Sequence, residues 1–370
     1  MHKRRTSPQR PQKITLSGKN KNTLTPLSVA GFSENDINTL NKSAVSFIIH
    51  NLQNQPEEVL VEVWNRGTLV FSDNQAICLP ANDSYYWIWD GYGNDDILDT
   101  KVLKSPDLLI RLTVRHNESS VVYDCPLNNS AAKVRWLDVR IDRGAYVVDV
   151  TLRPSFSYGG MSGQCAAVIA KSYAELEQLA KEGIERFWSR DGRLAQGIGE
   201  SIITREGEFN VRITADINAE PKMANFKLID RISARFGRST SLVLLRRVYY
   251  NSGFYSHKLA DSGQSANKAT VLTSQKFQLT AAHEVGHLIL DNFTRFTFRR
   301  DYSWSHKGTS TQYTQVALKN TPMPRTGEID LMKYSDNPVS MQQQWLHTVA
   351  SAEDVKGLIG LASVVFSLKG

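Results

Sequence analysis

The chain has 370 residues, of which 41% are hydrophobic and 22% are charged. This length and balance can bury a large core, so we expect a globular protein of two or three domains. The formal net charge of +7 is concentrated at the start of the chain, where no acidic residue precedes Glu34. The seven basic residues before it are Lys3, Arg4, Arg5, Arg10, Lys13, Lys19 and Lys21. The rest of the chain is close to neutral, so we expect no nucleic-acid partner.

Residues 1–40 contain this basic segment, which is rich in Pro, Ser, Thr, Asn and Gln. Such a composition predicts a disordered linker or a docking arm. Aromatic residues do not alternate with the charges, as a binder of single-stranded nucleic acid would need. The segment lacks the apolar stretch of a secretory signal, and no run of about 18 apolar residues occurs in the chain. We therefore expect no signal peptide and no membrane span.

Residues 41–158 are predicted to form short strands with an apolar side chain at every second position, as in residues 59–64, 110–115 and 146–153. Turn sequences such as NRG and PLNNS separate these strands. Several short alternating strands over about 110 residues predict an all-β sandwich of the immunoglobulin-like type. We expect Trp87 and Trp89 in its core, because aromatic side chains supply much of the buried area of a small sandwich.

The loop-rich sequence PSFSYGGMSG marks the expected start of a second domain, residues 159–370. Ser172 and Glu175 are spaced as a capping box at the start of an amphipathic helix, and Ser351 and Asp354 make another capping signal. Strand patterns lie between these helices. The order of elements predicts an α+β domain. The expected fold class is therefore a multidomain protein, with the all-β module followed by this α+β domain.

The sequence TAAHEVGHLILDNF, residues 280–293, contains two histidines four positions apart. On a helix these side chains share one face about 6 Å apart, so His283 and His287 can present imidazole nitrogens to one tetrahedral zinc ion, Zn2+. Glu284 is offset from that ion, but it can reach a water molecule bound there. Zinc lowers the pKa of such a water toward about 7, and Glu284 then acts as general base. The expected activity is the hydrolysis of peptide bonds.

The alternative for this triplet is an ordinary buried helix with satisfied core histidines. Three fixed residue types arise by chance in a chain of this length about one time in twenty. The apolar residues Phe277, Val285 and Ile289 make the segment helical and buried, where a carboxylate without a partner costs several kcal/mol. Gly286 lowers the helix propensity by about 1 kcal/mol relative to Ala, which indicates close packing. These features favour the metal site.

The third metal ligand is expected from a later segment, because the extended metzincin pattern requires a histidine at position 293, where this chain has Phe293. The downstream candidates are His306, Glu328, Asp330 and His347. Glu328 is favoured, because the apolar Leu331 and Met332 that follow it can form a floor under the metal. Two histidines and one glutamate would leave an open fourth position for water.

His306 keeps two possible roles beside Glu328. It can stabilise the tetrahedral oxyanion near the water, or it can itself be the third ligand. The plain alternative for Glu328 and Asp330 is that both are solvated acids of a surface turn.

Four blocks of sequence carry a family resemblance. HEVGH, followed by SWSHKGTS and GEIDLMKY, is similar to the zinc metallopeptidase toxin domains carried on, or delivered with, the spike proteins of bacterial type VI secretion systems. The upstream YYWIWDGYGNDDILDT is similar to the β-rich module before such domains, so the resemblance covers most of residues 45–345. It implies a zincin-like fold in which His283, His287 and Glu328 bind zinc and Glu284 is the catalytic base.

The resemblance also implies partners and a place of action. Such an effector is made in the bacterial cytoplasm, is exported without a signal peptide and acts on a peptide or protein substrate in the periplasm of a target bacterium. Its expected partners are a secretion spike protein and a cognate immunity protein in the producing cell. Two alternatives stay open at this point. One is a cytoplasmic housekeeping zinc peptidase, and the other is a non-catalytic adaptor that uses the β-sandwich.

Overall fold

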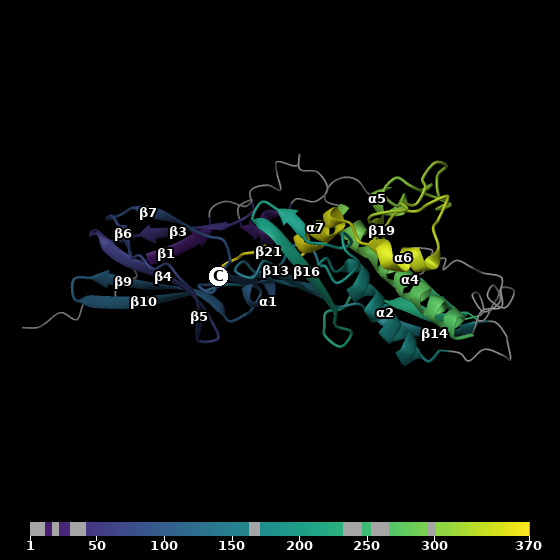
Figure 1. The fold of residues 1–370 in the computed structure, drawn as a ribbon. Coiled ribbons are helices and arrows are strands. Elements are labelled where there is room, and N and C mark those ends of the chain that lie inside the picture. The colour runs from purple at the N-terminus through teal and green to yellow at the C-terminus, as the bar shows by residue number, and fades with distance from the viewer. Residues whose placement is uncertain are drawn as a thin grey trace, which may run out of the picture.

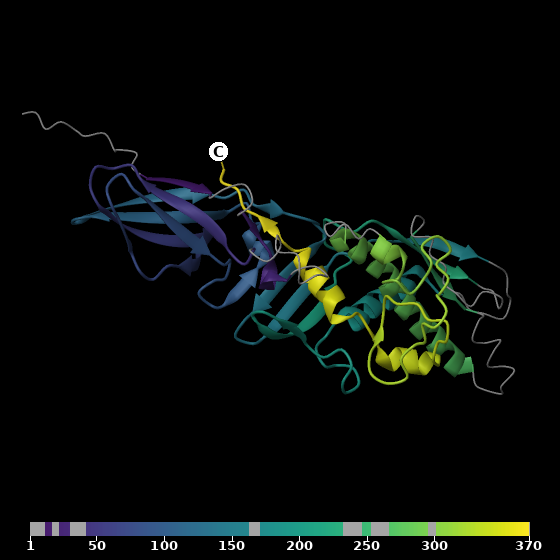
Figure 2. The same cartoon turned by 90° about the horizontal axis from the view of Figure 1, so that it is seen from above.

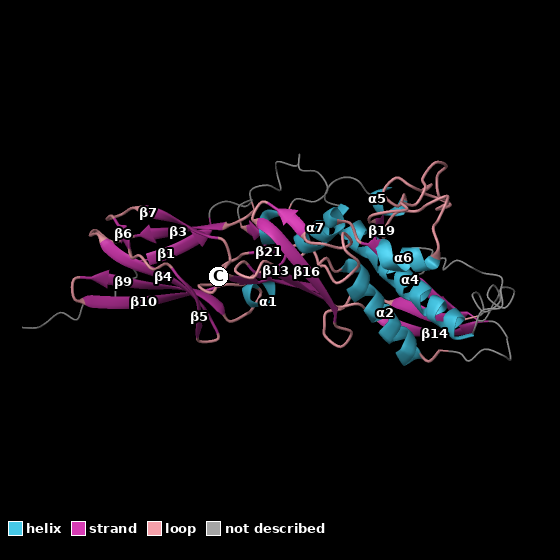
Figure 3. Cartoon of the chain, in the orientation of Figure 1, coloured by secondary structure: helices cyan, strands magenta, loops and turns pink. Residues whose placement is uncertain are grey.

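The computed structural model describes residues 12–16, 22–29, 42–162, 171–231, 246–252, 266–294 and 301–369. These residues form an elongated molecule, with layered strands at one end, a mixed sheet in the middle and the long helix α4 (Ala266–Thr294) at the other end (Figure 1 and Figure 2). Most of the described elements are strands, and most of the helices lie near α4 (Figure 3). The protein is therefore mostly β, with several sheets and a few helices.

Two antiparallel sheets face each other in the N-terminal module. The first sheet has the strand order β1 (Gln12–Leu16), β3 (Val45–Asn51) and β7 (Ser84–Trp89). The second sheet has the strand order β10 (Ser119–Pro126), β9 (Leu108–His116), β4 (Glu57–Asn65) and β5 (Thr68–Ser72). The short strand β6 (Ile77–Leu79) also pairs with β4. Burial alternates along β3, β4 and β9, because every second side chain faces the opposite sheet. Trp87 and Trp89 are buried as predicted, and Phe71 of the other sheet contacts both rings.

The C-terminal end of the chain returns to this module. The strand β21 (Val364–Val365) lies between β11 (Ser130–Ala131) and β2 (Thr23–Leu24), in a sheet of three strands. The ring of Phe366 lies edge-on to Trp89, with the centroids 6.0 Å apart. Both ends of the chain therefore contribute to the core of the first module.

The expectation of a disordered tail over residues 1–40 is wrong for the described part of that segment. Residues 12–16 form β1, and residues 22–29 run through β2 and the 3-10 helix η1 (Pro26–Ser28). Leu24 is 1% exposed and Leu27 is 2% exposed. The basic composition concealed this short apolar run, which is buried because the C-terminal strand lies beside it. Residues 1–11, 17–21 and 30–41 lie outside the described part of the chain.

A five-stranded sheet occupies the middle of the molecule. Its order is β15 (Ile202–Thr204), β16 (Gly207–Ala215), β13 (Val147–Leu152), β12 (Leu137–Asp142) and β8 (Ile97–Asp99), and the short helix α1 (Thr100–Leu103) follows β8. β13 pairs in parallel with β16, so the expected division between residues 41–158 and 159–370 cuts through one sheet. A period of two predicts a strand and its buried face, but it does not identify the strand's neighbour.

The third part packs the helix α2 (Tyr173–Trp188) against α4. A β-carbon at Gly183 would clash with the backbone oxygen of Gln278, so glycine permits this close approach. Helix α2 begins with the predicted capping box of Ser172 and Glu175, and Ser351 caps α7 (Ala352–Gly360). Beside these helices lies the sheet of β14 (Phe156–Ser162), β17 (Phe226–Arg231) and β18 (Arg247–Asn251).

Deletion of residues 1–29 should lower the melting temperature. The deletion removes β1, β2 and the buried side chains of Leu24 and Leu27, and burial of one leucine side chain contributes about 1.5–3 kcal/mol. Deletion of residues 1–11, which lie outside the described part of the chain, serves as the comparison. Thermal unfolding followed by circular dichroism compares the two variants. Equal melting temperatures would contradict the packing of this segment.

Candidate metal centre

Helix α4 carries the triplet of His283, Glu284 and His287, whose side chains are between 4% and 9% exposed. The four-residue spacing places both imidazoles on one side of the helix, and their Nε2 atoms lie 3.1 Å apart. Two nitrogens bound to one tetrahedral zinc ion at about 2.0–2.1 Å would lie about 3.3 Å from each other. The helix therefore presents two buried nitrogens at a spacing that suits a single metal ion.

His306 completes a group of three histidines. It follows the short helix α5 (Asp301–Trp304), and its side chain is fully buried. The nitrogen ligand atoms of His283, His287 and His306 all lie within 4.8 Å of one another. The centroid of the His306 ring is 5.3 Å from that of His283 and 4.8 Å from that of His287. These three side chains are close enough to bind one metal ion.

Hydrogen bonds to Nδ1 orient the two helical imidazoles. Nδ1 of His283 donates to the backbone oxygen of Leu331 at 2.7 Å. Nδ1 of His287 lies 3.2 Å from the hydroxyl of Ser303, and this hydroxyl donates in turn to the backbone oxygen of His287. In this network the proton of each ring is on Nδ1, which leaves the lone pair of Nε2 for a metal.

The turn that carries His306 orients the third imidazole. Nδ1 of His306 lies 2.6 Å from the hydroxyl of Ser310, which donates to the backbone oxygen of Thr311. His306 and Lys307 have φ angles of 48° and 59°, in the left-handed region that non-glycine residues rarely adopt. Such a conformation costs about 1–2 kcal/mol per residue. The surrounding contacts must therefore offset the strain of this turn.

A buried ion network holds the same turn. Nζ of Lys307 donates to Asp330 at 2.6 Å, to the hydroxyl of Ser351 at 2.8 Å and to Asp354 at 2.9 Å. The side chain of Lys307 is 8% exposed, and that of Asp354 is fully buried. Although burial disfavours the charged form, the two carboxylates raise the pKa of Lys307 above its usual value. The network ties the residue next to His306 to the N-terminus of α7.

Burial keeps the helical imidazoles neutral. Desolvation lowers the pKa of His283 to about 4, although its hydrogen bond to Leu331 acts in the opposite direction. Desolvation, helped by the neighbouring His283, also lowers the pKa of His287 well below its usual value. The neutral imidazole is the form that binds a metal. Three nitrogen donors match the protein ligands of a catalytic zinc site, so these residues fit the expected metal.

Glu328, the favoured third ligand, is engaged elsewhere. The guanidinium of Arg190 donates to its two carboxylate oxygens at 2.7 and 3.1 Å, and the backbone nitrogen of Gly199 donates at 2.9 Å. The side chain of Arg190 is 7% exposed, and a buried charge that loses its partner is costly. The structure therefore corrects the expected set of two histidines and one glutamate, because it groups His306 with the two helical histidines.

The remaining candidates also lie outside the group. Asp330, in the strand β19 (Ile329–Asp330), belongs to the Lys307 network, and Nδ1 of His347 lies 3.0 Å from a backbone oxygen. Phe293, where the metzincin pattern has a histidine, is buried against Gly357 of α7. Of the ligands expected from the sequence, the structure brings together His283, His287 and His306.

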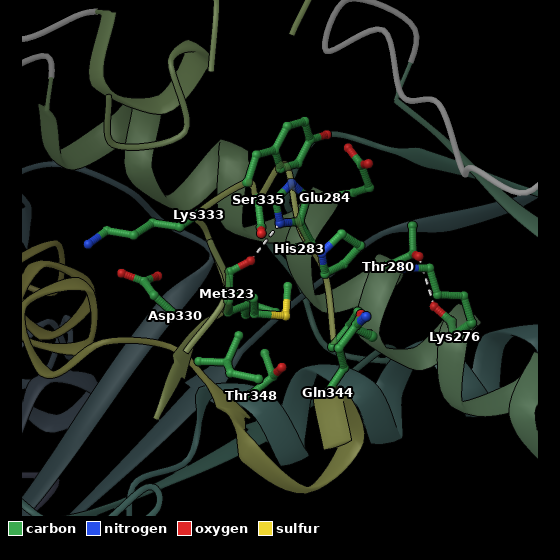
Figure 4. Close-up of a pocket in the computed structure, with 15 residues that line it drawn as sticks. Lys276, Thr280, His283, Glu284, Met323, Asp330, Lys333, Ser335, Gln344 and Thr348 are labelled. Carbon is green, nitrogen blue, oxygen red and sulfur yellow. Dashed lines mark hydrogen bonds between the residues drawn. The ribbon is translucent and has the colours of Figure 1, made fainter. Parts of the chain in front are cut away.

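A cavity of about 230 Å³ meets the group of histidines at His283. His283 and Glu284 line it, as do Thr280 one turn earlier and Lys276 two turns earlier on α4 (Figure 4). Other residues on its walls are Met323, Lys333, Tyr334, Ser335 and Gln344. A substrate in this cavity would contact both a candidate ligand and the candidate general base.

Tyr334, Ser303 and Ser310 are site residues that the sequence reasoning missed. The ring of Tyr334 stacks on His306, with the centroids 3.5 Å apart, and lies 5.5 Å from His283. Tyr334 ends the block GEIDLMKY, and the two serines lie three residues before and four residues after His306. The two serines could have been predicted from their position close to His306 in the sequence, because an imidazole that binds a metal needs a hydrogen-bond partner for its second nitrogen.

A scan against protein-family models and a search of curated proteins find no match for this chain. Among the described residues, no helix combines the length and the apolar character needed to cross a membrane. Fold and site together define a mostly β protein with a buried group of three histidines that can hold a metal ion.

The identity of the third ligand can be tested by zinc content. We expect His306→Ala to lower zinc affinity by more than the roughly 10- to 100-fold typical of losing an indirect partner, because it removes a nitrogen of the group. Glu328→Gln should keep zinc near the wild-type level. Mass spectrometry of bound metal after dialysis measures both. Loss of zinc in the Glu328 variant, with retention in the His306 variant, would restore Glu328 as the ligand.

The role of the buried ion network can be tested separately. We expect Lys307→Met to weaken zinc binding about 10- to 100-fold, because it frees the turn that orients His306. Lys356→Met, which breaks an ion pair with the half-exposed Glu353 on α7, is the matched control. Competition with a chelating dye gives the zinc affinity, and circular dichroism verifies that each variant is folded. Unchanged affinity in a folded Lys307 variant would refute the positioning role.

Proposed function

We propose that the protein is a zinc-dependent peptidase, in which an immunoglobulin-like sandwich precedes a zincin-like catalytic part. The observation that carries this proposal is the convergence of three buried imidazoles, one of which, that of His283, lines a cavity together with Glu284. A structural zinc site usually has four protein ligands, whereas a catalytic site has three and an open position. The group found among the described residues has three members, which supports a catalytic site.

The residues of the site have distinct roles in the proposed hydrolysis. A zinc ion held by His283, His287 and His306 would supply Lewis acidity and a water molecule with a pKa near about 7. Glu284 takes a proton from the attacking water and then gives it to the leaving amine. Glu284 is 6% exposed, so its carboxylate acts in a site that is largely shielded from bulk water. The contacts of Leu331 and Ser303 hold the helical imidazoles in the orientation that the reaction requires.

The proposed cellular role rests on the resemblance of the sequence to the toxin domains of type VI secretion. We propose that this peptidase is an antibacterial effector, delivered with a spike protein, that acts in the periplasm of the target cell. A cognate immunity protein would protect the producing cell. A cytoplasmic housekeeping peptidase would use the same metal centre. Toxicity in the periplasm is therefore the property that separates the two functions.

Glu284→Gln should bind as much zinc as the wild type but lose about 10²- to 10⁴-fold in hydrolysis, because the amide cannot act as general base. Production of the full chain with an added periplasmic signal in a bacterial host provides the cellular assay. We expect the wild type to stop growth and the Glu284 variant to be harmless. Zinc is measured in both purified proteins to verify that the variant differs in the base alone.

Two other outcomes would change the conclusion. Equal toxicity of wild type and Glu284→Gln would rule out hydrolysis as the cause of killing. A wild-type protein that binds zinc and cleaves peptides, but does not stop growth from the periplasm, would favour the housekeeping function. The exposed variant Lys227→Gln, on β17 and outside the cavity, is the control for expression and export.

A further inference from the structure

A second cavity, of about 600 Å³, lies between the N-terminal module and the middle sheet, in the region of α1 and β5 in Figure 1. Its walls come from the turn after β4, from α1, β11 and β12, and from the loop at residues 219–221. This volume is within the range of about 300–1,000 Å³ that is usual for small-molecule sites. The cavity shares no lining residue with the cavity beside the histidines.

Two partly buried cations share a single carboxylate in the wall of this cavity. Nζ of Lys104 lies 2.5 Å from one oxygen of Asp138, and the guanidinium of Arg153 lies 2.7 Å from the other. The side chains are 17%, 14% and 8% exposed for Lys104, Asp138 and Arg153. One carboxylate neutralises one of the two cations, so one positive charge remains at a place where solvent screens it weakly. An anion bound in the cavity would neutralise that charge.

The other charged groups of the lining extend the positive potential. Lys101 and Arg135 are exposed at the cavity, and neither forms an ion pair with any residue in the described ranges. Arg66 also lines the cavity, and its partner Asp107 does not. Asp138 and Glu220 are the acidic residues of the lining. Apart from the pair of Arg66 and Asp107, four cationic side chains therefore face two carboxylates, an excess of two positive charges.

Apolar side chains also line the cavity. They belong to Val102, Pro106, Ala131 and Pro221. A free inorganic ion would leave these surfaces in contact with water, whereas an organic ligand would cover them. The lining therefore suits a molecule with an anionic group and an apolar body.

We propose that this cavity binds a small organic anion, whose phosphate or carboxylate group lies against Lys104, Lys101 and Arg135. Lys104 uses two of its three N–H donors, on Asp138 and on the backbone oxygen of Leu137, which leaves one donor for the ligand. The ligand would contact both the N-terminal module and the middle sheet. Because a ligand that binds the folded state stabilises it, occupancy would raise the melting temperature of the whole chain.

Binding of two probe anions to the full-length protein tests this proposal. Phenyl phosphate and benzoate represent the phosphate and carboxylate chemistries on an apolar body, and isothermal titration calorimetry measures their affinity in a buffer free of both. We expect saturable binding of at least one anion and a higher melting temperature in its presence. The affinity should fall as sodium chloride is added, because the contacts are ionic.

The double variant Lys101→Gln, Arg135→Gln should bind the same anion at least tenfold more weakly. Both side chains are exposed, so these changes leave the core intact, and the single Arg135→Gln is measured beside them. The matched control is Arg212→Gln, Lys227→Gln, which removes two exposed charges outside the cavity. Failure of both anions to bind would overturn the proposal, and so would an equal loss of affinity in the control. None of these measurements depends on the metal centre or on peptidase activity.

Discussion

Burial of three imidazoles around one point is the constraint on which the rest of the C-terminal half depends. A neutral imidazole in a dry interior needs a partner for Nδ1 if Nε2 is to face a metal. The chain supplies these partners from separate segments, with the backbone of Leu331, the hydroxyl of Ser303 and the hydroxyl of Ser310. Leu331 is itself fixed, because its nitrogen donates to Val349 at 2.9 Å. The order of the site therefore comes from loops anchored to strands and helices.

Close packing holds helix α4 in place beneath these loops. A β-carbon at Gly286 would clash with the sulfur of Met332 and lie 2.9 Å from Trp188, so only glycine fits at this position beside the two candidate ligand histidines. The indole nitrogen of Trp188 also donates to the backbone oxygen of Ala282 at 3.1 Å. Glycine at this position lowers helix propensity, but it allows the residues after β19 to approach the helix. The close contact between Gly286 and Met332 therefore explains why a residue of low helix propensity lies in the helix that carries the site.

The sequence predicts the parts of this site that depend on local spacing and misses those that depend on distant partners. The two histidines of α4 could be paired from a separation of four residues. The third candidate ligand could not be identified from spacing, because Glu328 is bound by Arg190, which lies 138 residues earlier in the chain. The fold shows the same limit of local sequence patterns. Alternation identified the strands, but the pairing of β13 with β16 across the expected boundary is a non-local choice.

The last segment of the chain links the metal centre to the N-terminal module. Ser351 and Asp354, at the start of α7, bind the lysine beside His306. About ten residues later the same segment forms β21, and Phe366 then enters the aromatic core beside Trp89. A loss of packing in that core would shift β21 and, through α7, the ion network that offsets the strain of the His306 turn. A continuous set of contacts, through α7 and β21, therefore joins the N-terminal module to the turn that carries the third imidazole.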